Sequence, residues 1–558
     1  MSTIALRTVA SRRPSGCAAA RLCLAVAALA LLEVCPVQAD ALSVKVTTDR
    51  SIDCSTTSSI VADVCAGLAT DREKAIALFD FVRRLMFHYP NRPSRRDVHD
   101  TLHLINTYGY SFCSQQALLT VHLWQEAGIK GGVWSVPGHA TMQAEYHGAH
   151  RWFDALIGAY VFRRDGRGIA SLQDIAEDPT LLTRAMAEKR ACPAMVPCRT
   201  VLRDDAAAFS KHNPQYIREC ADQIDDVTFM ASSAPVAKPW QWGGPSPSRY
   251  EPRITLRRGE KVVYLWDTIP DQAYCTVLEP GDEPRAYCVT RDQLPPHHIC
   301  GERAERRDPN YRFWHPYLKA IQGVRTGRYA ANGRHTYHPD LSDGRTIADL
   351  AANTFVLPPD GDRRQPSVRV REAGKVSHLI VAVRTPHVYT GGVLQVEFQR
   401  ATADDVGRIS LLEPTRDEGE GVKLWDAADI KAPAGKVAAT VRLEGAIRGL
   451  RDLQFKVECA TSGDVNNAGI NDLGIDTIFQ HNMFARPYLV GGRNEVSVGA
   501  DGSLEGRTFT LTYAWQEGDA LRIHTETITT SPQAYTIDVA GADMPRMVSL
   551  EIGANYAP

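Results

Sequence analysis

A proline-rich stretch divides the sequence into two parts with different hydrophobic patterns. Residues 231–252 contain five prolines and two adjacent glycines, which interrupt regular elements. Before this stretch apolar residues recur mainly at helical spacing, and after it they mostly alternate as in strands. The chain of 558 residues is also too long for one hydrophobic core, since single cores stop growing near about 250–300 residues. We therefore predict a mixed α and β domain over residues 40–230, followed by a linker and by all-β structure.

Two helices are predicted in the first part. The sequence Thr70-Asp71-Arg72-Glu73 resembles a capping box. The apolar residues behind it have helical spacing and predict a helix over residues 71–86. A second helix should run over residues 114–127, with Gly128 as its stop.

Strand patterns dominate the sequence after the linker. Large apolar residues alternate in three places, namely Val262, Tyr264 and Trp266, then Leu394, Val396 and Phe398, then Phe509, Leu511, Tyr513 and Trp515. Many short strands with Gly and Asn turns indicate sandwich or jelly-roll domains. We predict a β domain over residues 253–370 and a C-terminal β-sandwich over residues 371–558. The expected fold class is α+β.

The first residues resemble a secretory signal peptide. Four arginines precede an eleven-residue apolar run, residues 22–32, and Val37-Gln38-Ala39 then offers small residues for cleavage. The run is too short to span a bilayer, which needs about 20 residues. Ser11-Arg12-Arg13 is a partial twin-arginine signal, which would be an alternative export route. We expect residues 1–39 to be removed near Ala39, giving a secreted or periplasmic protein with no transmembrane segment.

Ten of the thirteen cysteines lie beyond this signal, in a compartment where disulfides can persist. The pairs Cys54–Cys65, Cys192–Cys198 and Cys275–Cys288 are plausible local bridges. Spacing alone does not fix the connectivity. If Cys113 must stay a thiol, nine cysteines remain, so at least one other is unpaired.

Cys113 stands where a loop containing Gly109 meets the start of the second predicted helix. A thiol at a helix N-terminus faces the positive end of the helix dipole, which lowers its pKa and raises the thiolate fraction. Because the thiolate is the nucleophile, this is a favourable position for a reactive cysteine. The alternative is a buried structural or disulfide cysteine.

Two downstream residues complete a triad pattern. His139 lies 26 residues after Cys113, and Asp154 lies 15 residues after His139. Residues 141–146 alternate and His147-Gly148 predicts a turn, so His139 and Asp154 should lie side by side on a hairpin. A nucleophile, a base and a carboxylate that orients the base form the general triad. His139 would take the thiol proton and later protonate the leaving group.

These residues resemble the motifs of the transglutaminase-like superfamily, a papain-related group that includes transglutaminases, bacterial cysteine proteases and peptide N-glycanases. The resemblance covers residues 70–165 and rests on Gly109-Tyr110 before Cys113, Glu126-Ala127-Gly128-Ile129, Gly138-His139 and Arg151-Trp152-Phe153-Asp154. It implies a papain-like core with Cys113, His139 and Asp154 as the catalytic set. One departure is Ala140, because family members often have an aromatic residue directly after the histidine.

Three further residues are candidates for binding the substrate. The backbone N–H of Cys113 should contribute to an oxyanion hole, with the side chain of Tyr110 or Asn106 as a second donor. Ordinary packing beside the helix is the alternative for Tyr110. Arg163 could neutralise a substrate carboxylate, and its alternative is a solvated loop.

No cofactor or metal is expected. His99 and His103 could clamp a metal if they were helical, but no regular set of further ligands accompanies them. The segment from Asp464 to Gly469 begins like a calcium loop and lacks the later acidic ligands, which favours a plain turn. The formal net charge of −2 gives no bulk reason to expect a nucleic-acid partner.

The sequence therefore predicts a secreted thiol enzyme that forms an acyl intermediate on Cys113 from an amide substrate. Water or an amine would release the intermediate, and the substrate would belong to an extracellular polymer, whether protein, peptide or polysaccharide. The alternative is a carbohydrate-active enzyme, a lyase on a uronic-acid-containing polysaccharide, with His139 or Tyr110 as acid or base. A non-catalytic binding protein on an inactive core is the third possibility.

Overall fold

The computed structural model describes seventeen stretches of the chain. They are residues 42–88, 99–111, 113–137, 139–154, 159–187, 228–240, 248, 250–251, 253–267, 269, 272–277, 285–289, 330–358, 366–412, 421–501, 504–541 and 545–556. The expected signal peptide, residues 1–39, lies outside them. Leu42–Pro558 forms one compact unit.

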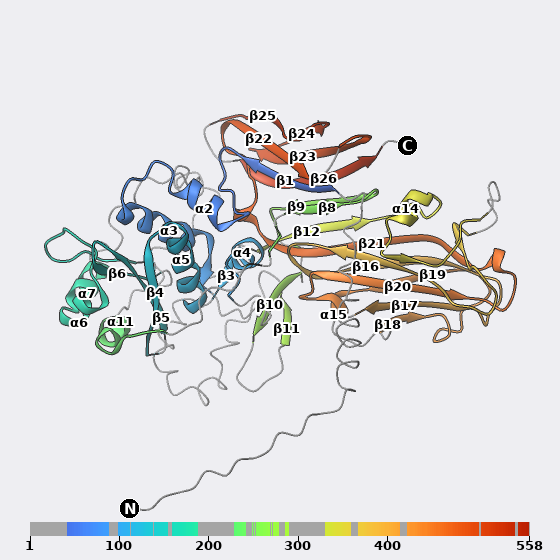
Figure 1. Cartoon of the computed structure of the whole chain (residues 1–558), viewed down its shortest axis with the longest axis horizontal. Helices are drawn as coiled ribbons and strands as arrows, with labels where there is room; N and C mark the ends of the chain where they lie inside the picture. The colour runs from blue at the N-terminus through green and yellow to red at the C-terminus, as the bar shows by residue number, and fades with distance from the viewer. Residues whose placement is uncertain are drawn as a thin grey trace, which may run out of the picture. The chain divides into compact units, whose positions relative to one another are not determined.

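The part before the proline-rich stretch combines helices with an antiparallel sheet (Figure 1). Its sheet has the order β6-β5-β4-β7 and consists of β4 (Lys130–Val136), β5 (His139–Tyr146), β6 (Ala149–Phe153) and β7 (Lys238–Pro239). Three main helices accompany it, namely α2 (Thr57–Val64), α3 (Asp71–Leu85) and α5 (Cys113–Glu126). The central helix α5 contacts α2, α3, β4 and β5, so it forms the core of this part together with the sheet.

Shorter elements complete this part. They are β2 (Phe87–His88), α4 (Thr101–His103), η1 (Leu104–Tyr108), β3 (Tyr110–Ser111), α6 (Leu172–Glu177), α7 (Thr180–Ala187), α11 (Thr228–Ser233) and η2 (Ala234–Val236). The strands β2 and β3 pair in parallel. The turn of π-helix η1 ends at Gly109, whose φ of 65° is easily reached only without a side chain.

Both predicted helices are confirmed. At the start of α3, the Thr70 hydroxyl accepts from the backbone N–H of Glu73, and the Glu73 carboxylate accepts from the Thr70 N–H at 2.9 Å. This is the reciprocal capping box that the sequence predicts. Helix α5 starts at Cys113, one residue earlier than predicted, and ends before Gly128, whose φ is 79°.

The predicted hairpin is confirmed as well. Strand β5 turns into β6 through His147 and Gly148, and Tyr146 pairs with Ala149 across the turn. Both turn residues have positive φ, 52° and 68°, as a two-residue type I′ turn requires. This tight turn fixes the register of the hairpin that carries His139 and leads to Asp154.

The β-rich C-terminal part contains three large sheets (Figure 1). A nine-stranded sheet has the order β19-β16-β21-β12-β9-β26-β23-β24, and β14 pairs with β21 off this path. Its strands are β9 (Glu260–Leu265), β12 (Ala330–Tyr337), β14 (Val368–Arg369), β16 (Val388–Arg400), β19 (Gly435–Arg442), β21 (Gly469–Asn482), β23 (Arg507–Glu517), β24 (Ala520–Ile528) and β26 (Arg546–Tyr556).

The other two large sheets have five and four strands. The five-stranded sheet, β13-β15-β20-β17-β18, contains β13 (Ala352–Asn353), β15 (Ser377–Arg384), β17 (Val406–Leu412), β18 (Val422–Asp426) and β20 (Asp452–Ala460). The four-stranded sheet, β25-β22-β1-β8, contains β1 (Leu42–Thr48), β8 (Ile254–Leu256), β22 (Gly492–Asp501) and β25 (Gln533–Val539). Smaller elements are the pair β10 (Ala273–Val277) and β11 (Arg285–Val289), with α14 (Gly344–Ala348), α15 (Glu444–Ile447), η4 (Val465–Asn467) and η5 (Met483–Ala485).

The sheets pack through alternating buried residues, as the sequence predicts for this β-rich part. Phe398 of β16 stacks on Trp425 of β18 at 5.2 Å between ring centroids, which joins the nine-stranded sheet to the five-stranded one. Val44 of β1 and Ile552 of β26 line one pocket, which places the four-stranded sheet against the other end of the nine-stranded sheet. This arrangement fits β-sandwich packing.

Two segments lie in places that their sequence position does not suggest. Strand β1, expected in the first domain, lies between β22 and β8, with Val46 opposite Val498. Within the proline-rich stretch, β7 pairs with β4, and Tyr250 is buried. Parts of this stretch are therefore packed rather than extended, while the boundaries near residues 230 and 370 stay predictions.

Buried polar side chains connect the helical part to the nine-stranded sheet. The amide of Asn482 on β21 donates to the carbonyls of Leu85 and Ile105, at 3.2 and 2.8 Å. Gln480 on the same strand donates to the Thr107 carbonyl at 3.3 Å. These bonds satisfy backbone carbonyls at the ends of α3 and η1, so the two parts share one polar junction.

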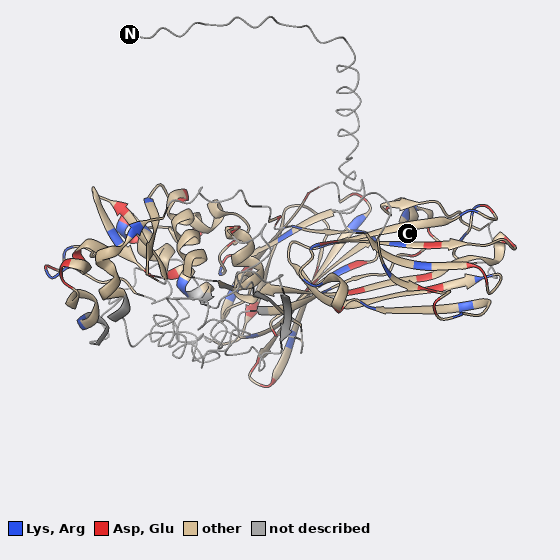
Figure 2. Ribbon diagram, turned by 90° about the horizontal axis from the view of Figure 1, so that it is seen from below, with Lys and Arg blue, Asp and Glu red and all other residues tan. Residues whose placement is uncertain are grey.

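Lys and Arg positions are interspersed with Asp and Glu positions along the described ribbon (Figure 2). Among the described residues, no helix is both long and apolar enough to cross a membrane.

One of the suggested disulfides is wrong. Cys54 is buried and carries a free thiol, so the bridge Cys54–Cys65 is not formed. Burial raises the pKa of the Cys54 thiol, which keeps it protonated. The other two suggested pairs involve side chains outside the described residues.

Candidate functional site

Cys113 is the first residue of α5 and is only 4% exposed. Its helix packs against β4 and β5, which places the start of the helix beside the start of the hairpin. The free backbone N–H groups of a helix N-terminus favour negative charge there. The thiol that the sequence singled out therefore lies at the predicted helix start, inside the domain rather than on its surface.

His139 and Asp154 form a buried pair next to this thiol. His139 is the first residue of β5, and Asp154 follows β6 and makes a two-bond bridge with Ala159. The distance from His139 Nε2 to Asp154 Oδ2 is 2.6 Å, and both side chains are 2% exposed. Such a short bond between buried groups fixes the orientation of the imidazole ring.

The surroundings of His139 favour its charged form. Burial opposes the charge, but the Asp154 carboxylate and then Cys113, which is also in hydrogen-bonding reach, raise the pKa of His139 above its usual value. Because Asp154 holds Nε2, the nitrogen left for the thiol is Nδ1. The structure thus brings Cys113, His139 and Asp154 together in the order that the sequence predicts.

Neighbouring side chains fix the two strands that carry the pair. Trp152 donates its indole N–H to the Thr141 hydroxyl at 2.8 Å, and Thr141 donates to the Phe153 carbonyl at 2.9 Å. Behind them, Phe153 packs against Phe79 and Trp124 at 5.3 and 5.1 Å between ring centroids. Hairpin, α3 and α5 therefore form one rigid support for the site.

The three binding candidates lie in different places. Both amide hydrogens of Asn106 are used, by the carbonyls of Cys54 and Leu102 at 2.8 and 2.9 Å. Asn106 consequently has no N–H left for an oxyanion. Arg163 is about half exposed and pairs with Asp174, with 3.7 Å between the charged atoms. Tyr110 lies on β3, close in sequence to Cys113, but its side chain lies outside the described residues.

Sequence reasoning missed two polar side chains that flank Cys113. Ser111 on β3 and Gln116 on α5 are 0% and 1% exposed. Within the described part of the chain, the Ser111 hydroxyl and both polar atoms of the Gln116 amide have no hydrogen-bond partner. Gln116 lies one helical turn after Cys113, on the same face. Its position three residues after a cysteine at a helix start could have predicted from the sequence that Gln116 lies near Cys113.

The side chains considered for metal binding contact other protein groups instead. His103 is buried, and Arg451 donates to its ring at 2.8 Å, so a cation already faces it. The Asp464 carboxylate accepts from Asn466 and Asn467 within its own turn, as the plain-turn alternative predicts. In the described stretches, no group of three or more His, Cys, Asp or Glu side chains could hold a metal ion.

Comparisons with known proteins assign no family. No family model matches the chain, and no curated protein matches it. Among solved structures, similarity is found to the glycoside hydrolase domain of Endo-D from Streptococcus pneumoniae R6, with 10% identity, 33% of each chain covered and a TM-score of 0.13. The chain therefore spans about a third of that structure.

A second similarity is to the pilus backbone protein RrgB from Streptococcus pneumoniae. One structure has 11% identity over 36% of this chain and 78% of that chain, with a TM-score of 0.08. The full-length structure has 8% identity over 56% and 57%, with a TM-score of 0.09. All three TM-scores are too low for an argument about fold or function.

Proposed function

We propose that this protein is a thiol enzyme that forms an acyl intermediate on Cys113 from an amide substrate. One observation carries the proposal: His139 lies close to both the Cys113 thiol and the Asp154 carboxylate, with 2.6 Å between His139 Nε2 and Asp154 Oδ2. A buried imidazole that a carboxylate orients, with a thiol close enough to raise its pKa, is placed for proton transfer. The thiol also lies at the start of α5, where a thiolate is favoured.

The reaction follows from these positions. His139 takes the thiol proton, and the Cys113 sulfur attacks the amide carbonyl carbon, forming a C–S bond and an oxyanion. When the oxyanion collapses, the C–N bond breaks, and the His139 imidazolium gives its proton to the leaving amine. Water or a second amine then attacks the thioester, giving its proton to His139, and the C–S bond breaks. The thiol is restored, and the acyl group leaves as an acid or a new amide.

The oxyanion needs donors at the start of α5. The backbone N–H of Cys113 is one, because it lies in the first turn, where helix N–H groups lack intrahelical partners. The second is the amide of Gln116 in this proposal, since it is buried, shares the helix face of Cys113 and has no partner in the described part. Asn106 is not an oxyanion donor in this proposal, because its amide hydrogens already bond the carbonyls of Cys54 and Leu102.

The arrangement of elements agrees with the transglutaminase-like resemblance. A helix that starts at the nucleophile packs against an antiparallel sheet whose adjacent strands carry the base and lead to the carboxylate. We propose a papain-like core for residues 70–165 on this basis. We further propose that the enzyme works outside the cytoplasm on an extracellular polymer, after cleavage near Ala39.

The lyase alternative gains no specific support. A lyase on uronic-acid polymers needs a cation for the substrate carboxylate, and Arg163 is exposed and already paired with Asp174. The thiol mechanism instead uses every member of the buried set. We therefore keep the lyase only as an outcome of the test.

The decisive test is Cys113→Ser, which keeps the shape of the side chain and removes a good nucleophile at neutral pH. A panel of peptides and polysaccharides is digested, and both released amines and absorbance from unsaturated uronate ends are recorded. We expect Cys113→Ser to lose at least about 1000-fold in kcat/KM for amine release. The matched control is Cys459→Ser, a buried free thiol in the β-rich part, which should keep full activity per folded molecule. Unsaturated ends produced by Cys113→Ser would establish the lyase instead.

A further inference from the structure

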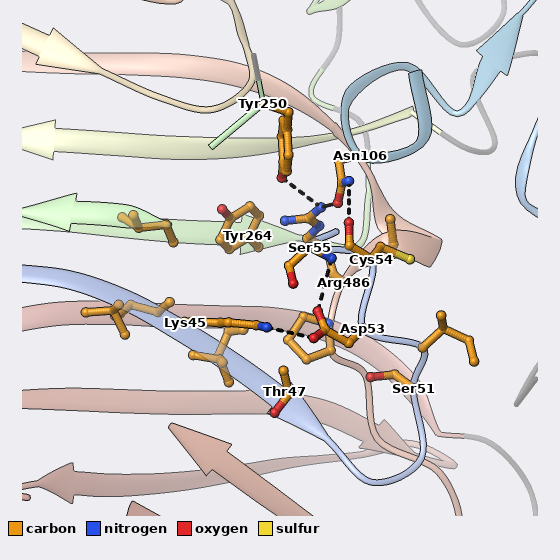
Figure 3. A pocket seen from close by; sticks show the side chains of 18 residues that line it. Lys45, Thr47, Ser51, Asp53, Cys54, Ser55, Asn106, Tyr250, Tyr264 and Arg486 are labelled. Carbon is orange, nitrogen blue, oxygen red and sulfur yellow. Dashed lines mark hydrogen bonds and ion pairs between the residues drawn. The ribbon is translucent and has the colours of Figure 1, made fainter. Parts of the chain in front are cut away.

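A pocket with a buried arginine lies at the junction of the two parts, apart from the Cys113 site (Figure 3). The empty space between its walls is about 550 Å³, a volume that includes open solvent. Its walls come from β1, the loop after β1, β8, β26 and the segment after η5. None of Cys113, His139 and Asp154 lines it.

The arginine is Arg486, which follows η5 and is only 7% exposed. One guanidinium nitrogen, Nη2, donates to the side-chain carbonyl of Asn106 and to the Tyr250 hydroxyl. The guanidinium carbon lies 5.3 Å from the centroid of the Tyr264 ring. The Nε–H is buried and has no hydrogen-bond partner in the described part of the chain.

In the described part of the chain, Arg486 lacks the carboxylate partner that the buried Arg83 and Arg257 have. Among the described residues, no carboxylate lies within ion-pair distance of it, and its polar neighbours are neutral. Of the other buried arginines described, Arg257 pairs with Glu260 and Arg83 with Asp80, while Arg400 donates to four backbone carbonyls. A buried charge without an opposite charge costs free energy unless a ligand supplies it. A guanidinium binds carboxylates and phosphates especially well, because its planar donors match two oxygens at once.

The charge and polarity of the other lining residues determine which anions the pocket favours. The charged side chains in the wall are Lys45, Asp53 and Arg486, and Lys45 pairs with Asp53 at 2.6 Å. These three charges sum to one positive charge, which a monoanion balances and a phosphate dianion exceeds. Eight of the other fifteen lining residues are aliphatic, namely Val44, Val46, Ile52, Ile254, Ala485, Pro487, Leu550 and Ile552, and the remaining seven are Thr47, Ser51, Cys54, Ser55, Asn106, Tyr250 and Tyr264. Such a wall stabilises an apolar body attached to the anionic group.

We propose that this pocket binds a small monocarboxylate with an apolar body, whose carboxylate pairs with Arg486. Asn106 positions the guanidinium from the side of the helical part, and Tyr250 positions it from the proline-rich stretch. The ligand would thus contact elements from both parts of the molecule, because the wall joins β1, Asn106 of η1, Tyr250 of the proline-rich stretch and the segment after η5. This binding site is separate from the proposed thiol chemistry.

The test uses probes that differ only in charge. Binding of N-acetyl-leucine and of its neutral amide to the full chain is measured by calorimetry and by the shift of Tm. We expect the acid to bind and stabilise, and the amide to do neither. Inorganic phosphate and sodium glucuronate are compared in the same buffer and should bind more weakly. Equal binding of the acid and the amide would show that the pocket does not recognise a carboxylate. Tighter binding of phosphate would contradict the preference for a monoanion, and tighter binding of glucuronate would contradict the preference for an apolar body.

Variants locate the site. Arg486→Gln should weaken binding of N-acetyl-leucine at least about tenfold, because a charge-assisted hydrogen bond is lost. Cys113→Ala should bind as the natural protein does, so the two sites succeed or fail separately. Retained affinity in Arg486→Gln, or lost affinity in Cys113→Ala, would overturn the location.

A second variant covers the case in which Arg486→Gln does not fold, which circular dichroism would reveal. Asp53→Asn removes a negative charge from the wall and leaves the arginine in place. It should tighten binding of N-acetyl-leucine several-fold, because the anion no longer faces a like charge. Unchanged or weaker binding would contradict the proposal.

Discussion

Among the described residues, two buried histidine–carboxylate pairs have nitrogen–oxygen distances of 3.2 Å or less, one in the helical part and one in the β-rich part. In the helical part His139 pairs with Asp154, with 2.6 Å between nitrogen and oxygen. In the nine-stranded sheet His335 of β12 pairs with Glu260 of β9, with 3.2 Å between the corresponding atoms. All four side chains are 2% exposed. By residue type, distance and burial, the pairs are nearly equivalent.

Their third partners differ. His335 meets the Tyr389 hydroxyl at 3.3 Å, and Glu260 also accepts from Arg257 at 2.9 Å. Burial opposes ionisation of Glu260, but Arg257 and then His335 lower its pKa to about 2, so the carboxylate stays charged and paired. Burial raises the pKa of Tyr389 well above its usual value, which excludes a phenolate at neutral pH. This network of His335, Glu260, Arg257 and Tyr389 contains no thiol.

His139 meets a thiol at the start of a helix instead of a phenol within a strand. A buried His–carboxylate pair therefore does not by itself make a reactive site. What distinguishes His139 is the group on its other nitrogen and the helix that favours a negative charge on that group. Substitutions in the two pairs should therefore separate into losses of activity and losses of stability.

The largest effect is expected at His139. His139→Ala should lower kcat/KM by about 1000-fold, since it removes the base and acid of the reaction. Adding Asp154→Ala should lower it little further, because Asp154 acts through His139 and members of one unit are not additive. The control is His150→Ala, an exposed histidine on the same hairpin, which should leave kcat/KM unchanged. If the fold losses in kcat/KM of the two single variants multiply in the double variant, His139 and Asp154 have separate roles.

A smaller effect, on stability alone, is expected at His335. His335→Ala should lower the free energy of unfolding by about 3 kcal/mol, because Tyr389 and Glu260 lose a buried partner. Activity per folded molecule should stay unchanged. The free energies of unfolding in urea are measured for His335→Ala and for the control His338→Ala. His338 is exposed, so its substitution should lower the free energy of unfolding by less than about 0.5 kcal/mol. A large loss of activity with intact stability would mean that His335 also has a catalytic role.

The smallest expected effect is a pH dependence that belongs to His139. Its pKa is raised in the folded protein, so the stability that it contributes is complete below the usual histidine pKa. That contribution is lost as the pH rises through the raised value. The difference in free energy of unfolding between the natural protein and His139→Gln should shrink by at least about 1 kcal/mol between neutral and alkaline pH. A difference that is constant or grows with pH would contradict the raised pKa.

Much of the local structure was predictable from short patterns. Thr70 and Glu73 predict the start of α3, Gly128 predicts the end of α5, and His147-Gly148 predicts the hairpin turn. Each is correct because the capping and turn groups are close in sequence, so their hydrogen bonds depend little on the rest of the chain. The order Cys113, His139, Asp154 was visible for the same reason, since one helix and one hairpin carry all three.

The errors concern contacts between distant segments. The sequence suggests Cys54–Cys65 as a disulfide, whereas Cys54 has a free thiol facing the Arg486 pocket. Asn106, close in sequence to Cys113, was expected in the oxyanion hole, and it is instead held by Leu102, Cys54 and Arg486. No local pattern predicts Arg486, because its partners are brought to it by the packing of β21 against η1.

The sequence by itself determined where helices and strands form and which residues can supply a thiol, a base and a carboxylate. Only the tertiary structure decided which strands pair, as with β1 beside β22, where Val46 lies opposite Val498. Alternation makes every half-buried strand look alike, so it specifies a buried face but not a partner. The same limit applies to His335, because the Tyr389 phenol on its second nitrogen is set by long-range packing, in which burial and buried hydrogen bonds favour one arrangement over its alternatives. The thiol near His139 was visible in the sequence because one helix and one hairpin carry both residues.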